Sequence, residues 1–142
     1  MTLNCIIIDD EPLAAGLLAS YAKKTLFLNL VGVFNSAVEG IKCIRENKVD
    51  LIFLDIQMPE LSGLEFARIL PKETKIIFTT AFSQYAIEGY KANAVDYLMK
   101  PISYDDFLAG ANRALDWFNS LHQSENASGD RFIFVKSDYK LV

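Results

Sequence analysis

Short apolar runs alternate along the chain with longer segments in which apolar residues recur at helical spacing. The short runs predict strands over residues 4–8, 28–34, 50–54, 75–80 and 94–99. Most of them are continuously apolar rather than alternating, which is expected of strands that are covered on both faces. The pattern therefore predicts a buried sheet with helices on both sides.

Helical patterns fill the intervals between these strands. Pro12 suits a first helical turn, and apolar residues follow it at helical spacing, at Leu13, Leu17, Leu18 and Tyr21. Three serines are predicted to cap helices, each with an acidic residue three positions later: Ser36 before 37–47, Ser62 before 63–70, and Ser103 before the last long helix. A further helix is predicted over 83–92.

Five strand–helix pairs in succession predict a parallel sheet with right-handed crossovers. The expected fold class is α/β, a flavodoxin-like, doubly wound (βα)5 architecture whose five strands lie in the order 2-1-3-4-5. In that order the first and third strands are neighbours, and ligands bind outside the carboxyl ends of the strands at this point.

The C-terminal end of the chain has a different character. Residues 122–130, HQSENASGD, are polar and aperiodic and are predicted to form a linker. Residues 131–142, RFIFVKSDYKLV, have a hairpin-like pattern. We interpret them as the start of a second, truncated domain, and a sixth strand of the first domain is the alternative.

Composition and charge narrow the class of protein. The chain has 142 residues, a length that suits one domain, and 51% of them are hydrophobic. No apolar run approaches the roughly 20 residues that span a bilayer, and the N-terminus does not resemble a signal peptide, so we expect a cytoplasmic protein without a membrane partner. The net charge of −4 should repel a phosphate backbone, so these residues are not expected to bind DNA themselves.

Cysteine and histidine offer little chemistry. Cys5 and Cys43 lie within apolar patterns and are expected to be buried free thiols. His122 is the single histidine, which argues against a histidine-based metal site or a nucleophile–base pair.

Polar residues gather where the predicted strands end. Asp9 and Asp10 follow the first strand, Asp55 the third, Thr80 ends the fourth, and Lys100 follows the fifth. If the strand order is right, three carboxylates converge at one edge, and at least one pKa should rise. A divalent cation would relieve this repulsion, and Mg²⁺ prefers such hard oxygen ligands. An acid beside Mg²⁺, a lysine and a hydroxyl can act as a nucleophile and form an aspartyl-phosphate.

Each residue of this set also has an ordinary structural interpretation. Asp9 and Asp10 could serve a turn or cap a helix, and Asp55 could be a turn acid. Thr80 could be a plain strand residue and Lys100 a solvated loop charge. The combination of all of them at successive strand ends favours function.

The stretches IIIDDEP, LIFLDIQMPELSG, IIFTTAFSQYA and AVDYLMKPI, spread over residues 3–121, resemble the receiver domain of bacterial two-component response regulators. The resemblance implies a receiver domain over 1–121 that is phosphorylated on Asp55. It also implies a set of supporting residues: Asp10, Asp55 and the Gln57 backbone carbonyl as Mg²⁺ ligands, Asp9 nearby through water, Thr80 as switch hydroxyl, Lys100 on the phosphoryl oxygens, Tyr97 as the aromatic that moves inward, and a cis bond before Pro101.

Further stretches, DDEPLA, TTAFSQYAIEGYKANAVDYLMKPI and FIFVKSDYKLV, resemble the LytTR-type regulators. This resemblance implies a transcription regulator with a sensor histidine kinase as partner and DNA bound only through the missing C-terminal domain. It implies dimerisation on phosphorylation, through the surface of helix 83–92, strand 94–99 and the last helix. The chain would be no enzyme beyond its own phosphoryl transfer and autodephosphorylation.

Three other classes of protein compete with this interpretation. A Mg²⁺-dependent phosphohydrolase usually needs a second acid two residues after its nucleophile, where this chain has Gln57. A flavodoxin-like cofactor binder would need a phosphate-cradling loop after the first strand, where the acids of D-D-E repel phosphate. A phosphorylation-independent interaction module would keep the fold and tends to lose an acid, the threonine or the lysine. All are present here, and this last alternative stays open.

Overall fold

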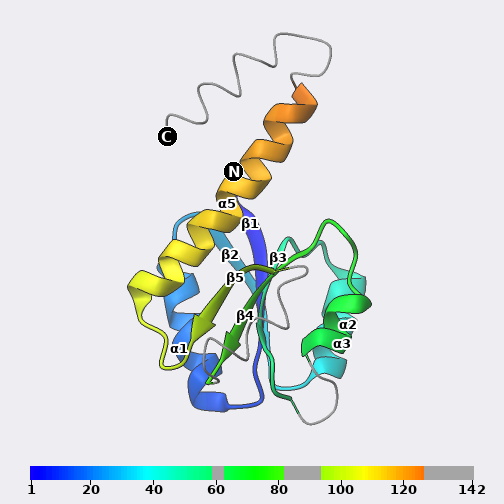
Figure 1. Cartoon of the computed structure of the whole chain (residues 1–142). Coiled ribbons are helices and arrows are strands. Elements are labelled where there is room, and N and C mark those ends of the chain that lie inside the picture. The colour runs from blue at the N-terminus through cyan, green and yellow to red at the C-terminus, as the bar shows by residue number, and fades with distance from the viewer. Residues whose placement is uncertain (59–62, 82–93, 127–142) are drawn as a thin grey trace.

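The computed structural model describes residues 1–58, 63–81 and 94–126, which form a sheet between two layers of helices (Figure 1). The strands are β1 (Leu3–Ile8), β2 (Leu28–Phe34), β3 (Leu51–Asp55), β4 (Lys75–Thr80) and β5 (Ala94–Met99). They are parallel and lie in the order β2-β1-β3-β4-β5, so the predicted doubly wound topology is confirmed.

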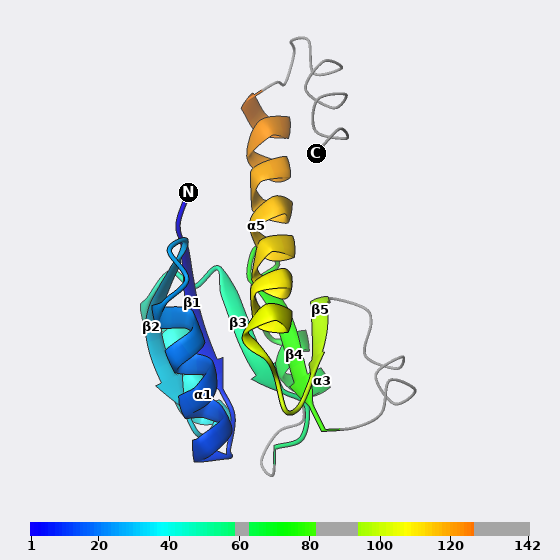
Figure 2. The same cartoon turned by 90° about the vertical axis from the view of Figure 1, so that its left-hand side faces the viewer.

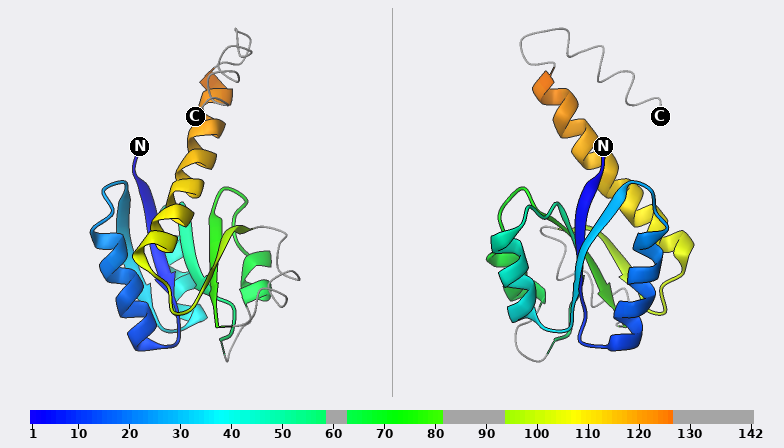
Figure 3. Two further views of the ribbon diagram at one scale, coloured as in Figure 1. Left: turned by 60° about the vertical axis from the view of Figure 1, so that its left-hand side comes forward. Right: turned by 180° about the vertical axis from the view of Figure 1, so that it is seen from behind.

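Helices cover both faces of the sheet, as the continuously apolar strands predicted. Helix α1 (Pro12–Lys23) and helix α5 (Tyr104–Asn126) lie on one face, and α2 (Ala37–Glu46) and α3 (Gly63–Arg68) lie on the other (Figure 1). The views in Figure 3 show the same two layers from other sides. Within the described residues, no helix is long and apolar enough to cross a membrane.

The predicted helix starts are confirmed where the structure describes them. Pro12 opens α1. Ser36 Oγ accepts a hydrogen bond from the Glu39 N–H at 3.3 Å, and Ser103 Oγ accepts one from the Asp106 N–H at 3.1 Å. These bonds satisfy amide groups that have no partner inside the helix. The predicted cap Ser62 and the predicted helix over 83–92 lie outside the described residues.

Each face of the sheet has its own hydrophobic core. The core under α1 and α5 includes Leu18, Phe53 and Phe107, and the rings of Phe53 and Phe107 stack with centroids 4.6 Å apart. The core under α2 and α3 includes Phe66 and Phe78. Residues of β1 and β3 supply both cores, which explains why these strands show no alternation of polar and apolar positions.

Helix α5 is longer than the sequence pattern predicted. It starts beside the carboxyl ends of the strands and runs past the opposite edge of the sheet (Figure 2). The predicted linker over 122–130 is wrong for residues 122–126, which are helical. Once a helix is established, each further residue adds one hydrogen bond at little cost, so a polar stretch can continue it. Residues 127–142, including the hairpin-like segment, lie outside the described residues.

The two cysteines are free and buried, as predicted. Burial raises the pKa of the Cys5 thiol to about 12. Cys43, on α2, also has a raised pKa because of burial. Both thiols are therefore protonated near neutral pH and act as small apolar side chains of the core.

Candidate functional site

The carboxyl ends of three strands, β1, β3 and β5, bring the predicted charged residues together. Asp9 follows β1, Asp55 is the last residue of β3, and Lys100 follows β5. Lys100 Nζ lies 3.0 Å from Asp9 Oδ2 and 3.5 Å from Asp55 Oδ2. Asp10 joins the group, since one oxygen from each of Asp9, Asp10 and Asp55 lies within 4.8 Å of the others. The parallel register produces this meeting, because it places Asp55 opposite Thr79 and aligns the strand ends.

Asp9 and Asp55 are held in the same way. Asp9 Oδ1 accepts a hydrogen bond from the Glu11 N–H at 2.9 Å, and Asp55 Oδ1 accepts one from the Gln57 N–H at 3.2 Å. Each carboxylate therefore stabilises the turn that follows its strand with one oxygen. The other oxygen, Oδ2 in both cases, faces Lys100. The turn role that the sequence left open is real, and it aims the second oxygen at the ammonium.

These carboxylates differ in their exposure to solvent. The Asp9 side chain is fully buried, Asp55 is 5% exposed, and Asp10 is exposed. Asp9 Oδ2 has no well-directed hydrogen-bond donor among the described residues, although Lys100 lies near it. Burying a carboxylate oxygen without a full set of partners is costly. A protein retains such an arrangement when the site has a use for it.

The crowding of charges changes the acidity of the site. Burial, and then the negative charge of Asp9, raise the pKa of Asp55 from its usual 3.8 to about 7, against the opposing effect of Lys100. Burial by itself would lower the pKa of Lys100, but its contacts with Asp9 and Asp55 outweigh burial and raise it. Near neutral pH the site therefore holds a charged lysine beside a carboxyl group that is readily protonated.

The three acids fit a divalent cation. They offer hard oxygens at mutual distances within 4.8 Å, and Asp9 Oδ2 is a buried oxygen that lacks a well-directed donor. Lys100 alone carries too little positive charge to balance Asp9, Asp10 and Asp55. Mg²⁺ prefers such oxygen ligands and keeps several waters, which the exposed side chain of Asp10 allows.

The other predicted site residues lie on or directly after β3, β4 and β5. Thr80 is the last residue of β4 and is buried, and its carbonyl accepts a hydrogen bond from the Lys100 N–H at 2.8 Å. The peptide bond between Lys100 and Pro101 is cis. Gln57 is exposed at the turn after β3. Tyr97 is half-buried on β5, where its ring stacks on Phe78 with centroids 5.7 Å apart, so it packs on the core beneath α2 and α3.

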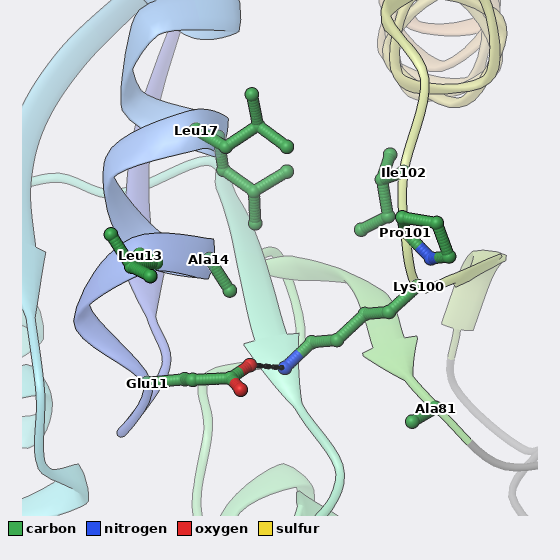
Figure 4. Close-up of a pocket in the computed structure, with 9 residues that line it drawn as sticks. Glu11, Leu13, Ala14, Leu17, Ala81, Lys100, Pro101 and Ile102 are labelled. Atoms are coloured by element: carbon green, nitrogen blue, oxygen red, sulfur yellow. Dashed lines mark hydrogen bonds and ion pairs between the residues drawn. The ribbon is translucent and has the colours of Figure 1, made fainter.

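Two residues of the site region were not predicted from the sequence. Tyr21, on α1, donates a hydrogen bond from its hydroxyl to the Ile102 carbonyl at 2.8 Å and so ties the loop that carries Lys100 to α1. Glu11 Oε1 accepts a hydrogen bond from Lys100 Nζ at 3.2 Å (Figure 4). The sequence offered one signal for Glu11, the third acid in D-D-E-P, whereas nothing local marks Tyr21.

Comparison with known families identifies this arrangement. The family model described as the response regulator receiver domain matches residues 5–112. The chain therefore belongs to the response regulator receiver domain family. The resemblance seen in the sequence is thus confirmed at the level of the family, and the fold agrees with it.

Individual relatives support the assignment. The chain is 38% identical over 115 residues to an uncharacterized response regulatory protein of Vibrio cholerae, covering 80% of this chain and 48% of that protein. It is 43% identical over 102 residues to the transcriptional regulatory protein BtsR of Escherichia coli K12, covering 70% of this chain and 43% of BtsR. The chain thus spans less than half the length of these relatives.

Solved structures agree with this assignment. The crystal structure of the response regulatory domain of protein mrkE from Klebsiella pneumoniae is 30% identical and has a TM-score of 0.69. The match covers 85% of this chain and 99% of that domain. The described fold therefore matches nearly the whole of that response regulatory domain.

Proposed function

We propose that this receiver domain accepts a phosphoryl group on Asp55. The observation that carries the proposal is the position of Asp55 Oδ2, which is aimed by the Gln57 N–H bond to Oδ1 and lies 3.5 Å from the Lys100 ammonium. A carboxylate oxygen would attack the phosphorus of a phosphohistidine. The new O–P bond forms as the P–N bond breaks, and its electron pair returns to the imidazole, which takes up a proton.

The remaining residues would provide charge and position. Asp9, Asp10, Asp55 and the Gln57 carbonyl would hold Mg²⁺, which neutralises negative charge on the transferring group when bound. Lys100 would bind a phosphoryl oxygen as a compact cation. Catalysis of this kind rests on positioning and electrostatic stabilisation, and the chain would act on no substrate beyond its own phosphorylation and dephosphorylation.

Phosphorylation would then shift the domain between two conformations. The added charge would draw the Thr80 hydroxyl toward the phosphoryl group, and Tyr97 would move into the space that this opens. A ligand shifts such an equilibrium only through different contacts in the two states. Thr80 is the last residue of β4, and Tyr97 lies on the neighbouring strand β5. The surface of residues 83–92, β5 and α5 would respond, and a second copy of the domain would bind there.

The function of the whole protein follows as a broader proposal. We infer a transcription regulator of LytTR type that receives its phosphoryl group from a sensor histidine kinase and binds DNA through a further domain. Two facts support it. BtsR is named a transcriptional regulatory protein, and the chain spans only 43% of its length.

Intact-mass spectrometry tests the phosphoacceptor directly. The protein is incubated with acetyl phosphate and Mg²⁺, and one phosphoryl adduct is expected. Asp55→Asn and removal of Mg²⁺ should each abolish the adduct. Asp50→Asn is the matched control, because the same substitution at the other end of β3 should leave the adduct intact.

An adduct that survives Asp55→Asn would refute the role of Asp55. No adduct under any condition would favour the alternative, an interaction module that works without phosphorylation. Mg²⁺ binding, measured by titration calorimetry, would then show whether the acids still form a metal site.

A further inference from the structure

Three carboxylate oxygens surround the ammonium of Lys100. Asp9 Oδ2 lies at 3.0 Å, Glu11 Oε1 at 3.2 Å and Asp55 Oδ2 at 3.5 Å. Lys100 Nζ donates a hydrogen bond to Glu11 Oε1, whereas Asp9 Oδ2 and Asp55 Oδ2 lie at ion-pair distance. A phosphoryl oxygen that takes over the N–H donated to Glu11 must therefore displace Glu11.

The three contacts differ in how easily they can be displaced. Asp9 and Asp55 are buried, and each is fixed at its Oδ1 by a backbone N–H. The Glu11 side chain is 63% exposed. Water can therefore solvate the Glu11 carboxylate in place of the Lys100 ammonium. Of the three carboxylates, Glu11 is the one whose release from Lys100 costs least.

The Glu11 carboxylate has no separate structural role in the described structure. Glu11 occupies the N-cap position of α1 but makes no side-chain cap hydrogen bond. Its side chain instead turns across the groove between α1 and the loop after β5 and meets Lys100 (Figure 4). This groove has a volume of about 390 Å³ and is lined by Leu13, Ala14, Leu17, Ala81 and Pro101, among others. Both long side chains therefore have room to separate.

We propose that Glu11 is a positioning residue that holds Lys100 in the resting site and competes with the phosphoryl group for its ammonium. The inference rests on the proposed function, because it assigns Glu11 the regulation of the same site. When the phosphoryl group arrives, Lys100 exchanges the Glu11 oxygen for a phosphoryl oxygen, and Glu11 moves into solvent. Glu11 thereby weakens the binding of the phosphoryl group. The strength of the Glu11–Lys100 contact determines how readily Lys100 becomes free to bind a phosphoryl oxygen.

The test is a double-mutant cycle with beryllofluoride, an analogue of the phosphoryl group, in the presence of Mg²⁺. Its dissociation constant is measured by calorimetry for the unchanged chain, Glu11→Gln, Lys100→Met and the double variant. Glu11→Gln should tighten binding about two- to fivefold, the factor expected for loss of a partly exposed competing ion pair. In the Lys100→Met background the same substitution should have no effect.

The cycle separates this inference from a simpler one. Removing any negative charge near the site would attract an anion more strongly, but that effect would persist without Lys100. Glu73→Gln is the matched control, because Glu73 is exposed and precedes β4 at the opposite edge of the sheet. Tightening that persists in the Lys100→Met background, or an unchanged affinity in Glu11→Gln, would overturn the proposal.

A second measurement needs no ligand and decides the matter if the Lys100→Met variants bind too weakly. The ¹³Cε signal of Lys100 in the ligand-free protein should shift in Glu11→Gln and stay in place in Glu73→Gln. An unchanged signal in Glu11→Gln would show that the contact does not form in solution and would overturn the inference. Failure of the proposed function has a different signature, since the unchanged chain would then neither bind beryllofluoride nor form the Asp55 adduct.

Discussion

Strand β3 has an aspartate at each end, and the two meet opposite conditions. Asp50, just before the strand, accepts a hydrogen bond from the Asn4 N–H at Oδ2 (2.8 Å), and its own N–H donates to the Asn4 carbonyl. Asp55, the last residue of the strand, shares Lys100 with Asp9 and Glu11 and has a pKa raised to about 7. Asp50 completes the hydrogen bonds between the amino ends of β1 and β3. Asp55 lies among more negative than positive charges.

Threonines near the two ends of β4 show the same contrast. Thr74, which precedes the strand, is buried and donates a hydrogen bond from Oγ1 to the Val49 carbonyl at 2.9 Å. Thr79, next to the end of the strand, is also buried, but its Oγ1 has no hydrogen-bond partner within the described residues. The amino edge of the sheet satisfies its polar groups, and the carboxyl edge leaves some of them short of partners.

This difference distinguishes polar residues that stabilise a fold from those that prepare a reaction. A buried polar group contributes to stability only when its partners are complete. Groups held close together with like charges and shifted pKa values are typical of functional sites. Removing an acid or a hydroxyl should therefore cost less stability at the carboxyl edge than at the amino edge, whereas removing a cation should cost more there.

The largest effect should come from removing the cation at the carboxyl edge. Lys100→Met leaves Asp9 and Asp55 without their shared counter-charge, and the free energy of unfolding in the absence of Mg²⁺ at pH 8 should fall by about 2–4 kcal/mol. Adding Mg²⁺ should restore part of this loss, because the metal replaces the missing charge. Urea unfolding measures both values.

The control for this change is Lys48→Met, since Lys48 is exposed at the amino edge of the sheet. Its effect should be within about 0.5 kcal/mol and independent of Mg²⁺. A loss of similar size in both variants would mean that the charge surplus at the carboxyl edge does not govern stability.

The second prediction concerns Asp55 and pH. Here the substitution Asp55→Asn should raise the free energy of unfolding, whereas Lys100→Met should lower it. Because the pKa of Asp55 is raised in the folded state, that state binds more protons than the unfolded chain between about pH 4 and pH 7. The free energy of unfolding therefore falls as the pH rises through this window. Asp55→Asn removes the carboxyl group and should stabilise the metal-free protein at pH 8 by about 1–3 kcal/mol, with little effect near pH 4.

Unfolding curves at several pH values, with and without Asp55→Asn, check this prediction. Asp50→Ala should act in the other direction, since it removes the acceptor of the Asn4 N–H. If Asp55→Asn destabilises the protein at pH 8, as Asp50→Ala should, then the charge of Asp55 does not destabilise the metal-free fold and the contrast between the two ends of β3 is wrong.

The smallest effect separates the two threonines. Thr74→Val should cost about 1 kcal/mol of unfolding free energy, because the Val49 carbonyl loses its donor. Thr79→Val has the same shape and removes a hydroxyl that already lacks a partner, so stability should be unchanged or rise by up to about 1 kcal/mol. Thermal unfolding of the two variants side by side gives the comparison, and equal losses would contradict it.

Much of the fold could be predicted from the sequence because its causes are local. Continuously apolar runs mark strands that are covered on both faces, and serine caps mark the starts of α2 and α5. The boundaries of the elements were predicted less accurately. Strand β3 starts and ends one residue later than predicted, and α5 continues through residues 122–126, where composition alone suggested a linker.

The candidate site was predictable only as a set of residues. The residues at the ends of β1, β3, β4 and β5 follow from the sequence once the strand order is assumed, because parallel strands end at one edge. Which oxygen faces which partner does not follow. The sequence did not predict the backbone hydrogen bonds to Oδ1 of Asp9 and Asp55. It also did not predict the contact of Glu11 with Lys100.

The sequence by itself determined which segments become strands and helices, which of their faces are apolar, and which acids stand at strand ends. The tertiary structure alone decided that three carboxylates share one ammonium, that the pKa of Asp55 rises to about 7, and that Tyr21 holds the loop after Lys100. The physical reason is one of range. Apolar periodicity and capping act between near neighbours in the chain, whereas burial and electrostatic coupling depend on residues such as Glu11 and Lys100, which meet only when the sheet has formed.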